Sequence, residues 1–448
     1  MHALANPAAA LAAGWEEPFT LALMLACFGA LAIAARWPIG VSLAAAAWAG
    51  AAVNGEYFPL RHLVEGAFSY LDPILVIATA MIFMRVLADG GALTAVGRAV
   101  EQRFGARPAF LLPILMLIVM FPGMITGSST ASVLTTGAMA ASILLGLGLA
   151  APRAAAIIAM GGILGMVAPP INIPAMLIGT GIDLPYVGFA APLALLSFPL
   201  ALVLVYALGW PVLRGGPRRA PAPSPLATTA LHRDAGGVTL TPVPVWRATV
   251  APVVAAVLML APRLWPLHVP DPGLPLTFLA AAAAGVVTLA RFPIITSLTT
   301  AMGESLGVLG ILAGVGGFIQ VMTLTGGRGW LVALMLGAPP WAIYAAAAVS
   351  MPLFGAVSAF GSASVLGVPF LLALLGRGEV VTTAALSLLA SLGDLMVPAA
   401  LAATLAAKVT GVSDRRQVLR LCVVPAIVAA GVAVLVLVFS SAVARVLG

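Results

Sequence analysis

The chain has 448 residues, of which 62% are hydrophobic and 8% charged. A soluble domain carries roughly a quarter charged residues, so the 21 basic and 14 acidic side chains are too few to cover a surface of this size in water. The composition therefore predicts an integral membrane protein. It excludes a nucleic-acid-binding protein, because the net charge of +7 is carried by short segments between long apolar runs. A β-barrel would instead show short segments of alternating polarity.

Apolar runs long enough for membrane helices follow one another along the chain, since a hydrocarbon core about 30 Å thick needs about 20 apolar residues per helix. Spans are predicted at about residues 18–35, 37–53, 73–88, 155–180, 185–213, 248–265, 274–290, 298–324, 380–406 and 420–446. Residues 108–150 and 338–376 differ, because in each a cluster of Gly and Ser separates two apolar runs. Each run is short for a comfortable crossing. These segments predict re-entrant helical hairpins, whose tips must be buried in protein or face water.

The basic residues predict the orientation of the chain in the membrane. With the N-terminus outside, most arginines fall on the cytoplasmic face, as the positive-inside rule requires, and both termini are periplasmic. The N-terminus has no basic segment before its apolar stretch, so we predict no cleaved signal peptide. Residues 214–247, rich in Pro and Arg, predict a flexible cytoplasmic linker. Cys27 and Cys422 both lie in apolar runs and predict buried thiols without a disulfide or metal framework.

Motifs of the first half recur in the second half in the same order and at nearly the same spacing. The sequence GSSTASV at 127–133 is matched by GSASV at 361–365, and GMVAPPINIPAM from Gly165 is matched by GDLMVPAALAAT from Gly393. An odd number of crossings separates the two copies, so the repeats are inverted. Inverted repeats with broken helices near the midplane are typical of secondary transporters. The predicted fold class is an all-α polytopic membrane protein of this kind, with two re-entrant hairpins and two broken helices.

The predicted organisation follows from this repeat. It comprises an N-terminal span (1–36), a first inverted repeat (37–213, with hairpin 108–150 and broken helix 155–180), the linker (214–247), a connecting span (248–273) and a second inverted repeat (274–448, with hairpin 338–376 and broken helix 380–406).

The hairpin tips and helix breaks carry the polar side chains of a predicted binding site. Free N–H groups at a helix N-terminus carry roughly half a unit of positive charge and suit a carboxylate. Hydroxyls and unwound carbonyls suit a hard cation such as Na⁺. Asp394 is the one acid predicted deep in a broken span, which makes it a functional candidate, although a solvated helix end would also accommodate it. The predicted substrate-binding residues are Ser128, Ser129, Thr130, Asn172, Ser362 and Ser364, and the predicted cation-binding residues are Gly127, Ser128, Pro169, Gly361, Ser362 and Asp394.

The first hairpin, Gly123 to Val133 followed by Thr136 and Gly137, resembles that of the large membrane subunit of TRAP transporters, the DctM-like family of the ion-transporter superfamily. Further similar segments are Leu71-Asp72, Asp89-Gly90-Gly91 and Ala168-Pro169-Pro170 with Pro174. The resemblance implies an elevator-type carrier in the bacterial inner membrane that takes up organic anions, above all carboxylates, with Na⁺. It also implies two partners, a small membrane subunit and a periplasmic substrate-binding protein.

The second half departs from that family. Ala359-Phe360-Gly361-Ser362 stands where the family carries Asp followed by Thr, and Met396-Val397-Pro398 stands where it carries Thr-Pro-Pro. The family pattern also lacks an acid at the position of Asp394. The coupling ion therefore stays open between Na⁺ and H⁺, and a Na⁺/H⁺ antiporter that uses Asp394 is the alternative function.

An intramembrane enzyme is the third class considered. Such an enzyme needs a paired catalytic set, and the four histidines lie in predicted loops or the N-terminal tail. The chain has no Walker A motif for ATP. We therefore predict a transporter rather than an enzyme, with no catalytic residues, no cofactor and no metal other than a coupling ion.

Overall fold

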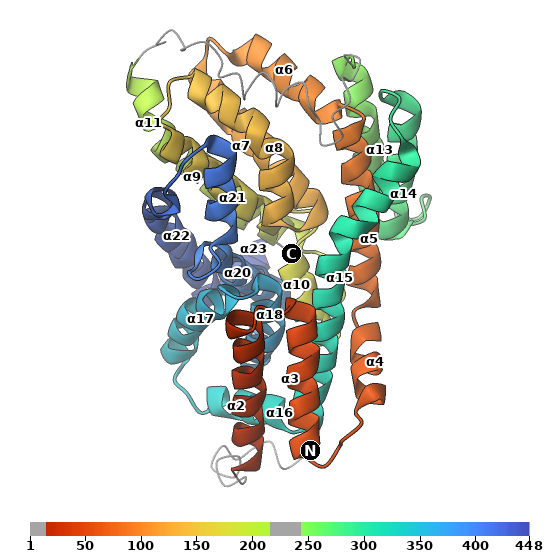
Figure 1. Cartoon of the computed structure of the whole chain (residues 1–448), viewed down its shortest axis with the longest axis vertical. Helices are drawn as coiled ribbons and strands as arrows, with labels where there is room; N and C mark the ends of the chain where they lie inside the picture. Colours follow the sequence, from red (N-terminus) through yellow and green to blue (C-terminus); the bar gives the residue numbers. More distant parts are fainter. Residues whose placement is uncertain (1–14, 216–242, 448) are drawn as a thin grey trace.

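The structure, a computed structural model, describes residues 15–215 and 243–447 (Figure 1). In this part every regular element is a helix, and eight helices are long and apolar enough to cross a membrane by length and composition. The chain is therefore a multi-pass membrane protein, as its composition predicts. Most of the predicted linker, residues 216–242, lies outside the described residues.

The helices of the first half follow the predicted spans closely. They are α2 (Glu16–Gly29) with its π-helical extension η2 (Ala30–Ala34), α3 (Ile39–Val53), α4 (Leu60–Phe68), α5 (Leu71–Asp89), α6 (Ala92–Phe104), α7 (Pro108–Thr126), α8 (Ser129–Gly146), α9 (Ala151–Val167), α10 (Ile173–Thr180) and α11 (Ala190–Gly215).

The helices of the second half include several short elements. They are α13 (Val245–Leu264), α14 (Gly273–Thr288), α15 (Ile294–Leu324), α16 (Gly327–Leu336), α17 (Pro340–Gly355), α18 (Ala359–Ser362), η3 (Ala363–Gly367), α19 (Val368–Ala373), α20 (Glu379–Ser391), η4 (Leu392–Leu395), α21 (Leu401–Thr410), α22 (Arg415–Val438) and α23 (Ser440–Leu447). The predicted span 420–446 is therefore two helices, separated at Phe439.

Both predicted hairpins and both predicted broken helices are present. Helices α7 and α8 pack side by side as one hairpin, and α17 with α18–α19 forms the other, approaching from the opposite end of the molecule (Figure 1). The broken helices are α9/α10 and α20/η4/α21. The argument from length was wrong for the first hairpin, because α7 and α8 have 19 and 18 residues. The hairpin is defined by the turn between the two helices and not by the length of either helix.

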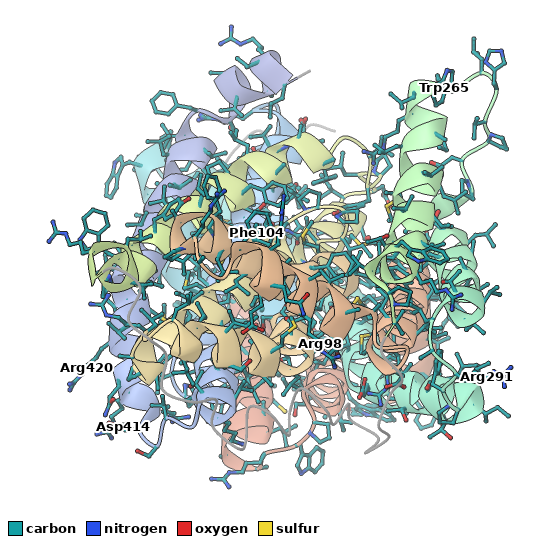
Figure 2. The ribbon with its side chains drawn as sticks, turned by 90° about the horizontal axis from the view of Figure 1, so that it is seen from above. Arg98, Phe104, Trp265, Arg291, Asp414 and Arg420 are labelled. Atoms are coloured by element: carbon teal, nitrogen blue, oxygen red, sulfur yellow. The ribbon has the colours of Figure 1, made fainter. Side chains whose placement is uncertain are left out.

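Three short helices, α4, α6 and α16, occupy segments outside the predicted spans; α4 and α6 are amphipathic, whereas α16 is apolar. Helix α6 lies across the upper end of the molecule in Figure 1, and α16 lies across the lower end. We call these the α6 end and the α16 end. Figure 2 looks onto the α6 end, where α6 carries Arg98 and where Arg291 and Arg420 project at the rim. A helix with one polar face lies readily along a membrane surface, which explains why hydropathy alone misses it.

The helices form two groups that pack extensively within themselves and sparingly against each other. The scaffold group comprises α2–α5 and α13–α15. The hairpin group comprises α7–α11 and α17–α22. Helices α6 and α16 connect the scaffold group to the two hairpins along the chain.

Glycines allow the scaffold helices to approach backbone to backbone. A Cβ atom on Gly66 of α4 would lie 2.3 Å from the carbonyl oxygen of Gly316 on α15, and one on Gly314 would lie 2.2 Å from the carbonyl oxygen of Gly40 on α3. Small residues at such crossings are the usual means of close packing between membrane helices, because lipid supplies no hydrophobic drive for association. The scaffold group is therefore closely packed around α15.

Candidate functional site

A cavity of about 740 Å³ lies at the boundary between the scaffold group and the hairpin group. Its scaffold wall comes mainly from α5 and α15. Its other wall comes from both hairpin tips and from the break of the second broken helix. From the tips, Ser128, Ser129 and Thr130 of the first hairpin and Ser358 and Ala359 of the second line the cavity, and Asp394 lines it as well. The two repeats therefore contribute to one site.

The tip of the first hairpin depends on two adjacent residues. Gly127 ends α7 with a φ of 62°, in the left-handed region, and a Cβ there would lie 2.4 Å from Cγ1 of Ile173. Only glycine meets both demands without strain. Ser128 then takes an extended conformation, and its Oγ accepts a hydrogen bond of 3.3 Å from the N–H of Ala131, which caps α8. The start of α8 is thereby fixed beside the cavity.

The second tip begins earlier in the sequence than predicted. The Oγ of Ser358 accepts a hydrogen bond of 3.1 Å from the N–H of Gly361, so the second hairpin helix starts at Ala359. Ser362 and Ser364 lie deeper in that helix, where their hydroxyls donate to the carbonyls of Met351 (2.6 Å) and Phe360 (2.8 Å).

The prediction that Ser362 and Ser364 stand at the helix N-terminus is therefore wrong. Both side chains are fully buried, and neither lines the cavity. The hairpins share the sequence Ala-Ser-Val at 131–133 and 363–365, but this match does not align the two capping serines, Ser128 and Ser358.

Asp394 joins the two repeats. It lies in η4, where the second broken helix is interrupted, and the Oγ of Ser129 at the first hairpin tip donates a hydrogen bond to its Oδ2. Among the described residues no ion pair involves Asp394. An ionised carboxylate within a membrane-spanning segment and without a basic partner costs free energy, unless it is protonated, hydrated or bound to a cation.

Asn172 lies at the break of the first broken helix but away from the cavity. Its Oδ1 accepts a hydrogen bond of 2.9 Å from the N–H of Ala175, which caps α10. Its Nδ2 donates to the carbonyl of Val167 (3.0 Å) and to Oγ of Ser387 (2.8 Å) on α20. These three hydrogen bonds hold the break together and tie it to the other repeat.

The structure thus divides the predicted site residues into two sets. Ser128, Ser129, Thr130 and Asp394 line the cavity together. The remaining predicted residues do not line it: Gly127, Pro169, Asn172, Gly361, Ser362 and Ser364.

The scaffold wall adds charged residues that sequence reasoning did not place in the site. Arg85 of α5 pairs through Nε with Oδ2 of Asp89 at 2.8 Å and through Nη1 with Oε1 of Glu304 on α15 at 3.2 Å. The hydroxyl of Ser297 also donates to Asp89, at 2.6 Å. The spacing of Arg85 and Asp89 by one helical turn is a signal for their pair. Nothing local in the sequence indicates the third member, because Glu304 belongs to the other repeat.

Comparison with known proteins supports the transporter fold. Residues 59–210 match the profile of the Na⁺/H⁺ antiporter family. No curated protein matches the chain significantly. The solved structure of the Alcanivorax borkumensis YdaH transporter, described as having an unusual topology, superposes with a TM-score of 0.54 at 16% identity, over 84% of this chain and 87% of that one. The protein is thus a multi-pass membrane protein with the fold of a solved transporter, and part of its first half is similar to the Na⁺/H⁺ antiporter family.

Proposed function

We propose that this protein is a secondary transporter that exchanges cations across the membrane, with Asp394 as the group that binds them. The observation that carries the proposal is the position of Asp394. It is a carboxylate in a cavity at the boundary of two helix groups, it accepts a hydrogen bond from the other repeat, and it has no ion pair among the described residues. A bound cation offsets its charge.

Exchange follows from the free-energy cost of moving the Asp394 carboxylate across the membrane without a bound cation. An uncompensated charge is expensive in a medium of low dielectric constant, so the hairpin group should cross the membrane only when Asp394 holds a proton or another cation. One carboxylate holds one cation at a time. Two cations that compete for it are therefore moved in opposite directions. The similarity of residues 59–210 to the Na⁺/H⁺ antiporter family supports this mode.

The division into two groups of helices supports an elevator movement. The cavity lies where the groups meet, so a displacement of the hairpin group along the scaffold group would carry Asp394 and both tips from one side of the membrane to the other. In this proposal the α6 end faces the cytoplasm of a bacterial cell, by the positive-inside rule, and both termini are periplasmic.

Uptake of an organic anion is the second candidate. The N-terminus of α8, capped by Ser128 beside the cavity, favours it, because free N–H groups attract a carboxylate. This candidate includes the role implied by the DctM-like resemblance, as the large subunit of a TRAP-type system with Na⁺ or H⁺ coupling, a small membrane subunit and a periplasmic binding protein.

Proteoliposomes that hold a pH gradient and an internal pH indicator test the proposal. Na⁺, Li⁺, K⁺ or an organic ammonium salt is added outside, with sucrose of equal osmolarity as the blank. We expect at least one cation to dissipate the gradient, and we expect Asp394→Asn to abolish that response. Asp414→Asn is the matched control, because Asp414 is an exposed helix cap and Asn also caps helices.

Two results would overturn cation exchange in favour of another mode. One is dissipation that Asp394→Asn leaves unchanged. The other is a lack of response to every cation together with Na⁺-driven uptake of a carboxylate such as succinate, which would favour the second candidate.

A further inference from the structure

The cavity is far larger and more apolar than an inorganic cation requires. Its volume of about 740 Å³ falls within the range of about 300–1,000 Å³ that is typical of sites for drug-sized organic ligands. Its apolar lining includes Met81 and Met84 of α5, Met139 of α8, Met166 at the end of α9, and Phe360 beside the second tip. Thioether side chains adapt to irregular shapes and contact aromatic rings favourably. We call these five residues the methionine wall.

The charged residues of the lining give the sign of the ligand. Arg85 is paired with both Asp89 and Glu304, so that cluster keeps one negative charge, and Asp394 adds a second. The N-termini of the two hairpin helices contribute roughly half a unit of positive charge each. The balance is about one negative charge, and Asp394 is the lining carboxylate that has no basic partner among the described residues. A second negative charge brought by a ligand would be repelled, whereas a positive one would be paired.

We infer that the cargo is an amphipathic organic cation, whose charged head lies at Asp394 and whose apolar body lies against the methionine wall. The inference rests on the proposed function and deepens it, because it names the class of the cation that competes for Asp394. The coupling cation and the cargo's head group occupy the carboxylate in turn. Their alternation makes the transport an exchange of an organic cation against an inorganic one or a proton.

Tetraphenylphosphonium and tetraphenylborate test the inference, since the two ions share shape and size and differ in the sign of their charge. Binding to the purified protein in detergent is measured by isothermal titration calorimetry, with protein-free micelles as the blank. We expect tetraphenylphosphonium to bind at least about tenfold more tightly than tetraphenylborate, which corresponds to about 1.4 kcal/mol. Asp394→Asn should weaken tetraphenylphosphonium by about tenfold and leave tetraphenylborate unchanged or tighter. Asp394→Glu should restore the preference, and Asp414→Asn should not alter it.

A second variant tests the apolar half of the site and does not depend on how Asp394→Asn folds. Met81→Gln keeps the length of the side chain and adds a polar amide, so tetraphenylphosphonium should bind several-fold more weakly while the preference for the cation persists. Equal or tighter binding of tetraphenylborate would overturn the inference, as would tetraphenylphosphonium binding that is indifferent to both variants.

The two proposals fail separately. Asp394-dependent exchange of Na⁺ in proteoliposomes without tetraphenylphosphonium binding would leave cation exchange standing and overturn the organic cargo. Asp394-dependent tetraphenylphosphonium binding without exchange of any cation would support the site and overturn the exchange.

Discussion

Asn172 lies at the break of the first broken helix, and its side-chain amide is hydrogen-bonded to other residues of the protein. Its amide makes three, to Ala175, Val167 and Ser387, and the residue is fully buried. Removing one partner of a buried hydrogen bond leaves the other unsatisfied, which costs about 1–3 kcal/mol per group. In the conformation described here, Asn172 therefore stabilises the first broken helix and its contact with the second repeat.

Replacing Asn172 by Ala should lower the thermal stability of the protein strongly. The variant loses the cap of α10 and leaves the Val167 carbonyl without its side-chain donor, so we expect a loss of about 3 kcal/mol. The measurement is thermal unfolding of the purified protein in detergent. Ser387→Ala removes one of the three bonds and should cost about a third as much. Equal melting temperatures for Asn172→Ala and the parent would contradict this structural role.

The residues of the site could be predicted in part. Sequence reasoning identified Asp394 and Ser129 as polar groups at breaks in apolar helices, which is where such groups have functional or structural use. Their contact could not be foreseen, because they belong to different repeats and lie 265 positions apart. The start of the second hairpin helix was misplaced because Ser358 and Ser362 are equally good capping residues, and only the folded backbone selects Ser358.

At the scale of elements, α15 depends on glycine for its packing. This helix of 31 residues runs beside α3, α4 and α5, and backbone contacts at Gly314 and Gly316 bring the first two close. Added volume at such a contact forces the helices apart, because a carbonyl oxygen of the neighbouring backbone cannot move as a side chain does.

Gly66→Ala should therefore destabilise the scaffold group. Its new Cβ would lie 2.3 Å from the carbonyl oxygen of Gly316, and we expect a loss of about 1–3 kcal/mol, read as a lowered melting temperature in detergent. Gly310→Ala on α15 is the matched control. No atom lies within 4 Å of its Cβ position, and Ala is the better helix former, so this variant should be neutral or slightly stabilised. A stable Gly66→Ala protein would show that the α4–α15 crossing is looser than described.

The long apolar runs, and the Gly and Ser clusters that interrupt some of them, predict most of the helices. The long apolar runs gave spans within a few residues of the observed helices, and the Gly and Ser clusters correctly marked both hairpins. Helices α4, α6 and α16 were missed, since they are short or carry a polar face and so resemble the loops between spans. The amphipathic period of α4 and α6 is itself a local signal, which a search for long apolar runs does not use.

On the scale of the whole molecule, the cavity reaches from the hairpin tips to Asp89 and Thr94, near the α6 end. A contact at the opposite side joins the connecting helix α16 to the hairpin group. There Arg328 at the start of α16 donates from Nη2 to the carbonyl oxygen of Gly181, at the end of α10, over 2.6 Å. A guanidinium at a helix C-terminus also interacts favourably with the helix dipole. In the proposed elevator movement, this contact would hold the hairpin group in the position in which the cavity extends towards the α6 end.

Arg328→Ala should shift the population away from this conformation. The reporter is Thr135→Cys, a cavity position, in a Cys27→Ser/Cys422→Ser background, labelled with a membrane-impermeant maleimide in inside-out vesicles. We expect rapid labelling in the parent and labelling that is several-fold slower with Arg328→Ala, because a hydrogen bond from a charged donor contributes about 1.5–3 kcal/mol.

Arg61→Ala removes an exposed ion pair with Glu65 and serves as the control, which should label like the parent. Labelling from the periplasmic side alone in the parent would contradict the proposed orientation.

The contact between Ser129 and Asp394 makes the two repeats chemically unequal. The residue after the capping serine is Ser129 in the first repeat and Ala359 in the second. Gly165 of the first repeat corresponds to Gly393 of the second. The next residue is Met166 in the first repeat and Asp394 in the second. Two perfectly equivalent repeats would make the inward and outward states degenerate by symmetry. Because the hydroxyl and the carboxylate each occur in one repeat only, these four side chains would make the two end states of the proposed movement unequal in energy.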